Sequence, residues 1–218
     1  MSPLNRVTAL AAALLLISAC GGPSGGGGGG VAQETSAETV GSNSSDFAGM
    51  QKCPESGTWD NYLKAEQDKD PSQYDTDKKD LDDLKAAGAN DTYVAVYAAS
   101  TSDCGNFGAD TPSGKVAQIY TIRFKDQASA SANFKVHQKD FHLSDSDLEN
   151  IKSAGGTVKQ GGETGLGDNS VLVEFSIAGQ SFYAAFWQKD KFEVAIITFN
   201  VPTTDSESAT KKVSDRIK

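Results

Sequence analysis

The feature that most constrains the fold of this chain is a set of three β-rich runs, separated by short turns, in its C-terminal third. The runs are NSVLVEFSI (169–177), QSFYAAFWQ (180–188) and FEVAIITF (192–199). Ala178-Gly179 and Lys189-Asp190 stand where tight hairpin turns belong. Strands joined by such short turns pair antiparallel, so this part of the chain predicts a β-meander.

The preceding half of the chain adds two strands and several amphipathic helices. TYVAVYAA (92–99) and KVAQIYTIRF (115–124) alternate in the way that strands do. Helical patterns cover residues 59–67, about 76–87, about 127–141, a short segment opened by a capping box at 146–149, and the residues after Thr204. We therefore predict an α+β fold: a single antiparallel β-sheet of about five to six strands, with helices packed mostly on one face.

The first twenty residues have the layout of an export signal. One positive charge, Arg6, precedes an apolar run from Val7 to Ile17 that only Thr8 interrupts. A run of this length suits the hydrophobic region of a signal peptide and is shorter than the ~20 residues that a membrane-spanning helix needs. We expect residues 1–19 to be a signal peptide that is removed on export.

The tetrad Ile17-Ser18-Ala19-Cys20 resembles the lipobox of bacterial lipoproteins, in which a cysteine follows an aliphatic residue and two small ones. The resemblance implies a type II signal peptide, a diacylglycerol on the Cys20 sulfur and cleavage before Cys20. Several acyl chains would anchor the protein firmly, since each buried methylene contributes about 0.8 kcal/mol. The alternatives are an uncleaved membrane helix and a secreted protein with a chance cysteine. Gly21, in place of the aspartate that retains some lipoproteins in the inner membrane, leaves the cell membrane and the outer membrane both open as destinations.

Residues 20–45 predict a lipidated cysteine followed by a tether. The segment consists mainly of Gly, Ser, Thr and Ala with almost nothing apolar to bury, so it is expected to remain a flexible coil. No predicted strand precedes its glycine run and no predicted helix opens after it, which excludes a phosphate-binding loop. The remaining residues, 46–218, are expected to form one extracytoplasmic α+β domain.

The charge balance excludes some partners. Removal of residues 1–19 would discard Arg6 and change the formal net charge from −9 to −10. An acidic chain of this kind lacks the basic surface that nucleic acid or anionic lipid would require. We expect no nucleic-acid partner, and membrane contact through the N-terminal lipid anchor.

Once Cys20 is assigned to the lipid, Cys53 and Cys104 remain as a pair. In an oxidising envelope compartment the default for such a pair is a disulfide, here closing a loop that could contribute about 4 kcal/mol. A redox or metal-binding thiol pair is the alternative, but it lacks the close CxxC spacing typical of those sites.

No motif in the chain indicates a metal, a cofactor or a catalytic residue. The acidic stretch Asp68–Asp83 fails the EF-hand pattern, because Gln73 and Lys79 stand where glycine and bidentate glutamate are required. Its interleaved lysines are typical of a solvated helix surface. His137 and His142 would face about 140° apart on a helix, so we expect them at the surface or its boundary. Hydrolase and zinc-protease motifs do not occur in the mature chain.

The segment GGETGLGD (161–168) has glycine spacing that could cradle a phosphate. It leads into a strand, however, and not into a helix N-terminus, so a loop entering the meander is the better interpretation. The step Gly165-Leu166-Gly167-Asp168 into a strand resembles one found in small, uncharacterised envelope lipoprotein domains.

The aromatic residues of 180–188 are the feature with most functional potential. Phe182 and Phe186 alternate with Tyr183 and Trp187, so both faces of this strand are apolar. If helices cover only one face, Tyr183 and Trp187 would form an exposed binding surface. The alternative is that both residues belong to the core of a sheet covered on both sides.

Together these features predict a membrane-anchored extracytoplasmic lipoprotein whose domain is a non-catalytic binding or interaction module of the cell envelope, with an envelope protein or a small ligand as partner. Two other classes stay open. One is a structural or assembly lipoprotein, and the other is an envelope hydrolase without a recognisable motif.

The lipidation hypothesis gives the first testable prediction. Cys20→Ser removes the acyl acceptor, so the protein should move from the membrane pellet to the soluble fraction after cell lysis and ultracentrifugation. Ser24→Ala, a change in the tether, should leave the protein in the pellet. Firm pelleting of the Cys20→Ser protein would contradict the assignment of the anchor.

Overall fold

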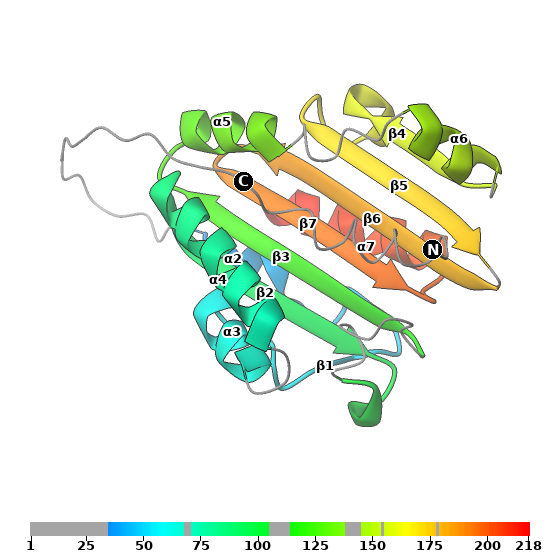
Figure 1. Cartoon of the computed structure of the whole chain (residues 1–218), viewed down its shortest axis with the longest axis horizontal. Coiled ribbons are helices and arrows are strands. Elements are labelled where there is room, and N and C mark those ends of the chain that lie inside the picture. The colour runs from blue at the N-terminus through cyan, green and yellow to red at the C-terminus, as the bar shows by residue number, and fades with distance from the viewer. Residues whose placement is uncertain (1–34, 68–70, 105–113, 138–144, 154, 178) are drawn as a thin grey trace.

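Figure 1 shows the computed structural model of the chain, which describes residues 35–67, 71–104, 114–137, 145–153, 155–177 and 179–218. Residues 1–34, and with them Cys20 and most of the expected tether, lie outside the described residues, as does His142. Within the described chain, one antiparallel sheet of seven strands is combined with helices, so the predicted α+β class and single sheet are confirmed.

The strands follow the spatial order β1-β2-β3-β7-β6-β5-β4, and every neighbouring pair is antiparallel. Their bounds are β1 (Gln51–Lys52), β2 (Ala89–Ala98), β3 (Val116–Phe124), β4 (Thr157–Gln160), β5 (Ser170–Ile177), β6 (Gln180–Lys189) and β7 (Phe192–Phe199). The sheet has more strands than the five to six predicted, because β1 and β4 are edge strands of two and four residues. Runs this short carry too little alternation to be recognised in a sequence.

The predicted helical segments agree with the helices of the structure more closely than the predicted number of strands agrees with the observed number. The α-helices are α2 (Ala37–Gly41), α3 (Trp59–Gln67), α4 (Pro71–Ala86), α5 (Gln127–His137), α6 (Asp145–Ser153) and α7 (Thr203–Arg216), with short 3₁₀ turns η2 (Thr101–Asp103) and η4 (Gly161–Thr164). Helix α4 begins five residues earlier than predicted, at Pro71. Proline is favoured at a first helical position because its fixed φ suits the helix and its missing N–H leaves no bond unmade.

Both faces of the sheet are covered by helices: four of the six described α-helices lie on one face, in keeping with the prediction, and α2 and α7 cover the other. Figure 1 shows α3, α4, α5 and α6 in front of the sheet and α7 behind it. The core divides in the same way. Residues of α2 and α7 pack with one face of β2, β3, β6 and β7, whereas residues of α3, α4 and α5 pack with the other face of β2 and β3. Because side chains alternate along a strand, an apolar strand such as β6 has to be covered on both sides.

The N-terminal segment from residue 35 belongs to the folded domain. Ala37 and Val40 of α2 are fully buried against the sheet, and Phe47 is 1% exposed. Residues 35–45 therefore belong to the folded domain and not to the expected tether. The sequence pattern misled here because five helical residues among many Ser, Thr and Gly residues show too little periodicity to be recognised.

An ion pair from the far end of the chain holds this segment. Arg216 of α7 donates to both carboxylate oxygens of Asp46, at 2.7 and 2.8 Å, and its Nε donates to the carbonyl oxygen of Val40 at 2.7 Å. The Asp46 side chain is fully buried. Two parallel bonds from a guanidinium to a buried carboxylate are among the strongest polar contacts in proteins.

Cys53 and Cys104 form the predicted disulfide, with a Cα–Cα distance of 5.7 Å. The bridge joins the segment after β1 to the segment after β2 and η2, so it fastens an edge of the sheet. Its sulfurs lie near the carboxylate of Glu55, and these three residues are the one group of potential metal ligands that converges among the described residues. Because both sulfurs are oxidised, the group has no thiolate to offer a metal.

The buried ion pair gives a stability prediction. Arg216→Met keeps the length of the side chain but leaves Asp46 charged and unpaired in the core, so the free energy of unfolding should fall by about 3 kcal/mol. Lys211→Met, on the exposed side of the same helix, breaks only the surface pair with Asp215 and should change it by less than about 0.5 kcal/mol. Urea denaturation followed by tryptophan fluorescence measures both. Equal midpoints for the two variants would show that the pair does not hold the N-terminal segment.

Candidate functional site

The predicted binding surface at Tyr183 and Trp187 does not exist as a surface. Tyr183 is 1% exposed and Trp187 is fully buried, and both pack beneath α7. The Tyr183 hydroxyl forms a 2.9 Å hydrogen bond with Thr210 of α7, and burial raises the pKa of this phenol above its ordinary value. These aromatic residues are core, and the prediction that they bind a ligand at an exposed face is wrong because α7 covers that face.

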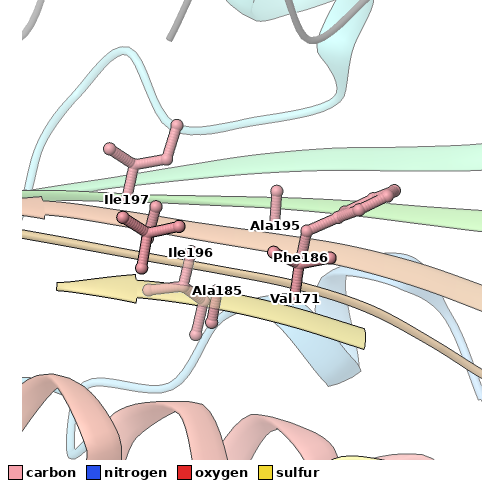
Figure 2. A pocket seen from close by; sticks show the side chains of 8 residues that line it. Val171, Ala185, Phe186, Ala195, Ile196 and Ile197 are labelled. Carbon is pink, nitrogen blue, oxygen red and sulfur yellow. The ribbon is translucent and has the colours of Figure 1, made fainter. Parts of the chain in front are cut away.

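A hollow lies on the opposite face of the same strands. It holds about 250 Å³ of unfilled space, part of it open to solvent, and its lining comes from three neighbouring strands. The lining residues are Val171 and Val173 of β5, Ala184, Ala185 and Phe186 of β6, and Ala195, Ile196 and Ile197 of β7. Figure 2 shows Phe186, Ala195 and Ile197 on one side of the strands, and Ala185 and Ile196 on the other side. The hollow therefore has a floor of hydrocarbon side chains and backbone.

The register explains why this part of the sheet is hollowed. Two rows cross the strands side by side: Val171, Phe186 and Ala195 form one, and Val173, Ala184 and Ile197 form the other. Each row contains one alanine among larger residues, and both alanines are partly exposed whereas the other four residues are buried. The short side chains leave the backbone beneath them uncovered, so the surface dips along the diagonal between Ala184 and Ala195.

One end of the hollow is polar. The next row along the strands consists of Gln188 on β6 and Glu193 on β7, which are 7% and 0% exposed. Same-face neighbours along a strand are about 7 Å apart, so Glu193 adjoins Ala195 of the floor. Asn133 of α5 donates to both Glu193 oxygens, at 3.1 and 3.0 Å, and Nδ1 of His137 lies 3.9 Å from Oε2 of Glu193. Burial raises the pKa of Glu193, although the contacts with His137 and Asn133 oppose that rise.

Helix α5 connects the polar end to the apolar floor. Phe134 of α5 stacks on Phe186 of the floor, with ring centroids 4.7 Å apart and planes at 15°. His137 follows one turn later on the same helix and is 7% exposed, so the expectation that it lies at the surface or its boundary is wrong. Its neighbour Val136 is a large hydrophobic residue at the exposed side of this helix, with 40% of its surface accessible.

Helix α4 adds a carboxylate that has no hydrogen-bond partner. Asp80 is 1% exposed, and neither of its carboxylate oxygens is hydrogen-bonded. Burial, followed by the negative charges of Asp77 and Asp83, raises the pKa of Asp80 to about 7, against the opposing effects of Lys79 and His137. Because buried polar groups in native proteins are almost always hydrogen-bonded, an unpartnered buried carboxylate is a mark of a functional or strained position.

The prediction that the charged residues of α4 form a solvated face is therefore only half correct. Lys78 pairs with Asp82, and Lys79 pairs with Asp83, each over four residues at the surface, as the charge pattern indicated. Asp77 and Asp80 of the same helix, by contrast, are 8% and 1% exposed. They share the buried stripe with Leu81 and Leu84, at a spacing of three and four residues. From that spacing the burial of both acids could have been predicted.

The glycine-rich segment 161–168 enters β5 as predicted, by way of η4. Ser170 closes this loop by donating to the carbonyl oxygens of Gly161 and Gly167. Its glycines serve a turn, since Gly161, Gly165 and Gly167 all have positive φ angles.

Comparisons with known proteins add little to this description. No family model and no curated protein matches the chain. Among solved structures, the chain is similar to the extracellular domain of PknH from Mycobacterium tuberculosis, over 62% of this chain and 68% of that one, with 12% identity and a TM-score of 0.39. An overlap this partial does not establish a common fold or function. Among the described helices, none has the length and apolar character that crossing a bilayer requires.

The buried acid predicts a pH-dependent stability. The pKa of Asp80 in the folded state lies above its unfolded value near 3.8. The part of the folding free energy that depends on a protonated Asp80 is therefore fully present below about pH 4 and is lost as the pH rises through about 7. Asp80→Asn cannot ionise. Its gain in unfolding free energy over the wild type should therefore grow by about 2 kcal/mol between pH 5 and pH 8.

Urea denaturation at several pH values measures this difference, in which the contribution of Glu193 cancels because both proteins contain it. Asp82→Asn, on the exposed side of α4, serves as the matched control and should give a difference that is flat with pH. A flat difference for Asp80→Asn would show that the carboxylate is not desolvated.

Proposed function

We propose that this chain is a lipid-anchored, extracytoplasmic binding module that holds a small apolar ligand in the hollow on β5, β6 and β7. The observation that carries the proposal is the pair of partly exposed alanines, Ala184 and Ala195, whose neighbours along the middle of β6 and β7 are buried. A protein selected only for stability would fill such a depression with larger side chains, because unfilled space forfeits packing contacts.

The form of the hollow limits its ligand. Much of its unfilled space is open solvent, and the volume that the centre of a water-sized sphere can enter is about 10 Å³, far below the range of about 300–1,000 Å³ that is typical of drug-sized ligand sites. A ligand would therefore lie over the floor and would not be enclosed by it. The side chains of the floor are hydrocarbon throughout, with valine, alanine, phenylalanine and isoleucine. A single alkyl chain or a compact apolar group suits this space, and the floor itself offers no nucleophile, acid or base. Binding therefore fits the hollow better than catalysis does.

The anchoring part of the proposal rests on the sequence. The lipobox-like tetrad ending at Cys20 and the glycine-rich residues after it support a lipoprotein whose folded domain is displayed outside the membrane. The disulfide between Cys53 and Cys104 supports the same placement, because disulfides persist in oxidising compartments.

Filling the hollow tests the proposal. Ala195→Leu adds three carbon atoms at the centre of the floor, in a position that already meets solvent, so the fold should tolerate it while the ligand space is lost. We expect the fluorescence of an apolar probe such as Nile red, titrated with the purified protein, to rise with wild type and to stay near baseline with the variant.

The matched control is Ala48→Leu, at an exposed position outside the sheet, which should bind the probe as the wild type does. Circular dichroism and thermal melting verify that both variants fold. Equal probe binding by wild type and Ala195→Leu would refute the hollow as the binding site.

A further inference from the structure

The side of the hollow that adjoins β3 contains a buried amide without a hydrogen-bond partner. Gln118 of β3 is fully buried, and neither its Nε2 nor its Oε1 atom is hydrogen-bonded. Buried polar side chains in native proteins almost always have a partner, because desolvating them without one is unfavourable. A methionine or a leucine at this position would fill a similar volume without that cost. The presence of a glutamine is explained if a ligand supplies the missing partners.

The register of the strands places Gln118 beside the floor of the hollow. Gln118 lies directly opposite Ile197, which lines the hollow, and Ile197 lies opposite Ala184. Tyr120, the next residue on the same face of β3, lies opposite Ala195. Residues directly opposite each other on antiparallel strands share a face and have Cβ atoms about 4.5–5.5 Å apart. Gln118 is therefore separated from the open part of the floor by a single side chain.

The amide of Gln118 can turn toward the floor without breaking a bond within the protein. A glutamine side chain is long and has several rotatable bonds, and here no hydrogen bond holds its end in one position. The floor beside Ile197 is open because Ala184 and Ala195 are short and partly exposed. A molecule that lies over these alanines is thus within reach of an amide that lacks both a donor and an acceptor.

Resting on the function proposed above, we infer that the ligand of the hollow is an uncharged alkyl amide. Its chain lies over Ala184 and Ala195, and its head group forms two hydrogen bonds with Gln118. A primary amide has an accepting oxygen and a donating N–H group side by side, as the glutamine side chain has. Two such groups pair edge to edge, so both unbonded atoms of Gln118 gain a partner from one ligand.

A charged head group suits this side of the hollow less well. The row of residues that contains Gln118 is otherwise apolar and consists of Val96, Ile197, Ala184 and Val173. An ionised group lying here would lose water without gaining an opposite charge. Glu193 at the polar end pairs with Ile122, which is four residues from Gln118 along β3 and so about 13 Å away.

Three probes with the same acyl chain test the head group. Octanamide, methyl octanoate and octanoate are titrated against the purified full-length protein at pH 8, with displacement of Nile red as the readout. Octanamide should bind about tenfold more tightly than methyl octanoate, because the ester has no N–H group and leaves Oε1 of Gln118 unbonded. Octanoate, which is ionised at this pH, should bind most weakly of the three.

A variant of β3 assigns the preference to one residue. Gln118→Met keeps the length of the side chain but removes the amide, so it should lose the preference for octanamide and bind methyl octanoate as the wild type does. Without ligand it should melt at least as high as the wild type, since no hydrogen bond of the fold is lost. Gln160→Met, at an exposed position of the edge strand β4, is the matched control and should keep the tenfold preference.

The outcomes separate this inference from the proposal on which it rests. Equal affinities of the wild type for octanamide and methyl octanoate, or a preference that persists in Gln118→Met, would overturn the amide head group and leave the apolar site standing. A marked loss of stability in Gln118→Met would show that the amide is bonded within the fold, and would overturn the inference in the same way. Failure of methyl octanoate to bind the wild type would overturn the apolar site itself, and the inference would fall with it.

Discussion

The structure depends on one constraint: a sheet that is apolar on both faces has to be covered on both faces. Strand β6 shows this most directly, since Phe182 and Phe186 point to one side and Tyr183 and Trp187 to the other. Helices α2 and α7 close one face, with Trp187, Phe192 and Val194 among the fully buried residues beneath them. The other face receives α3, α4, α5 and α6 in separate groups, and the hollow lies where the floor is lined by alanines. The site is thus a consequence of uneven coverage and not of a dedicated loop.

Local patterns in the sequence identified the elements, and the pairing of the cysteines followed from their number and compartment. The helices after Trp59 and Gln127 and all five longer strands were predicted because hydrophobic period and turn residues act over a few residues. The candidate site was missed because its features depend on distant neighbours. Alternation in β6 indicated two apolar faces but not which helix covers each, so the sequence left Tyr183 and Trp187 open between an exposed binding surface and the core. The aspartates of α4 were assigned to solvent because their lysine neighbours dominate the pattern, although Asp77 and Asp80 share the spacing of Leu81 and Leu84.

The buried acids carry an energetic argument that packing alone does not provide. Asp46 and Asp80 are both removed from water, but Asp46 is bonded by both arms of Arg216 and Asp80 is bonded by nothing. The ion pair between Asp46 and Arg216 holds the N-terminal segment against α7, and this role is structural. The second residue weakens the fold wherever it is ionised. A buried residue that destabilises the fold is typical of positions where local stability is sacrificed for function.

The course of the chain relates this site to the proposed anchor. Thr35, the first described residue, accepts a hydrogen bond from Arg123 at the end of β3, and Ala37 donates to Asp91 near the start of β2. Arg123 pairs with Phe192 and Ile122 pairs with Glu193 across to β7, so residue 35 and Glu193 lie at the same end of the sheet on opposite faces. The described chain therefore begins at the polar end of the hollow, on the face that the hollow does not occupy.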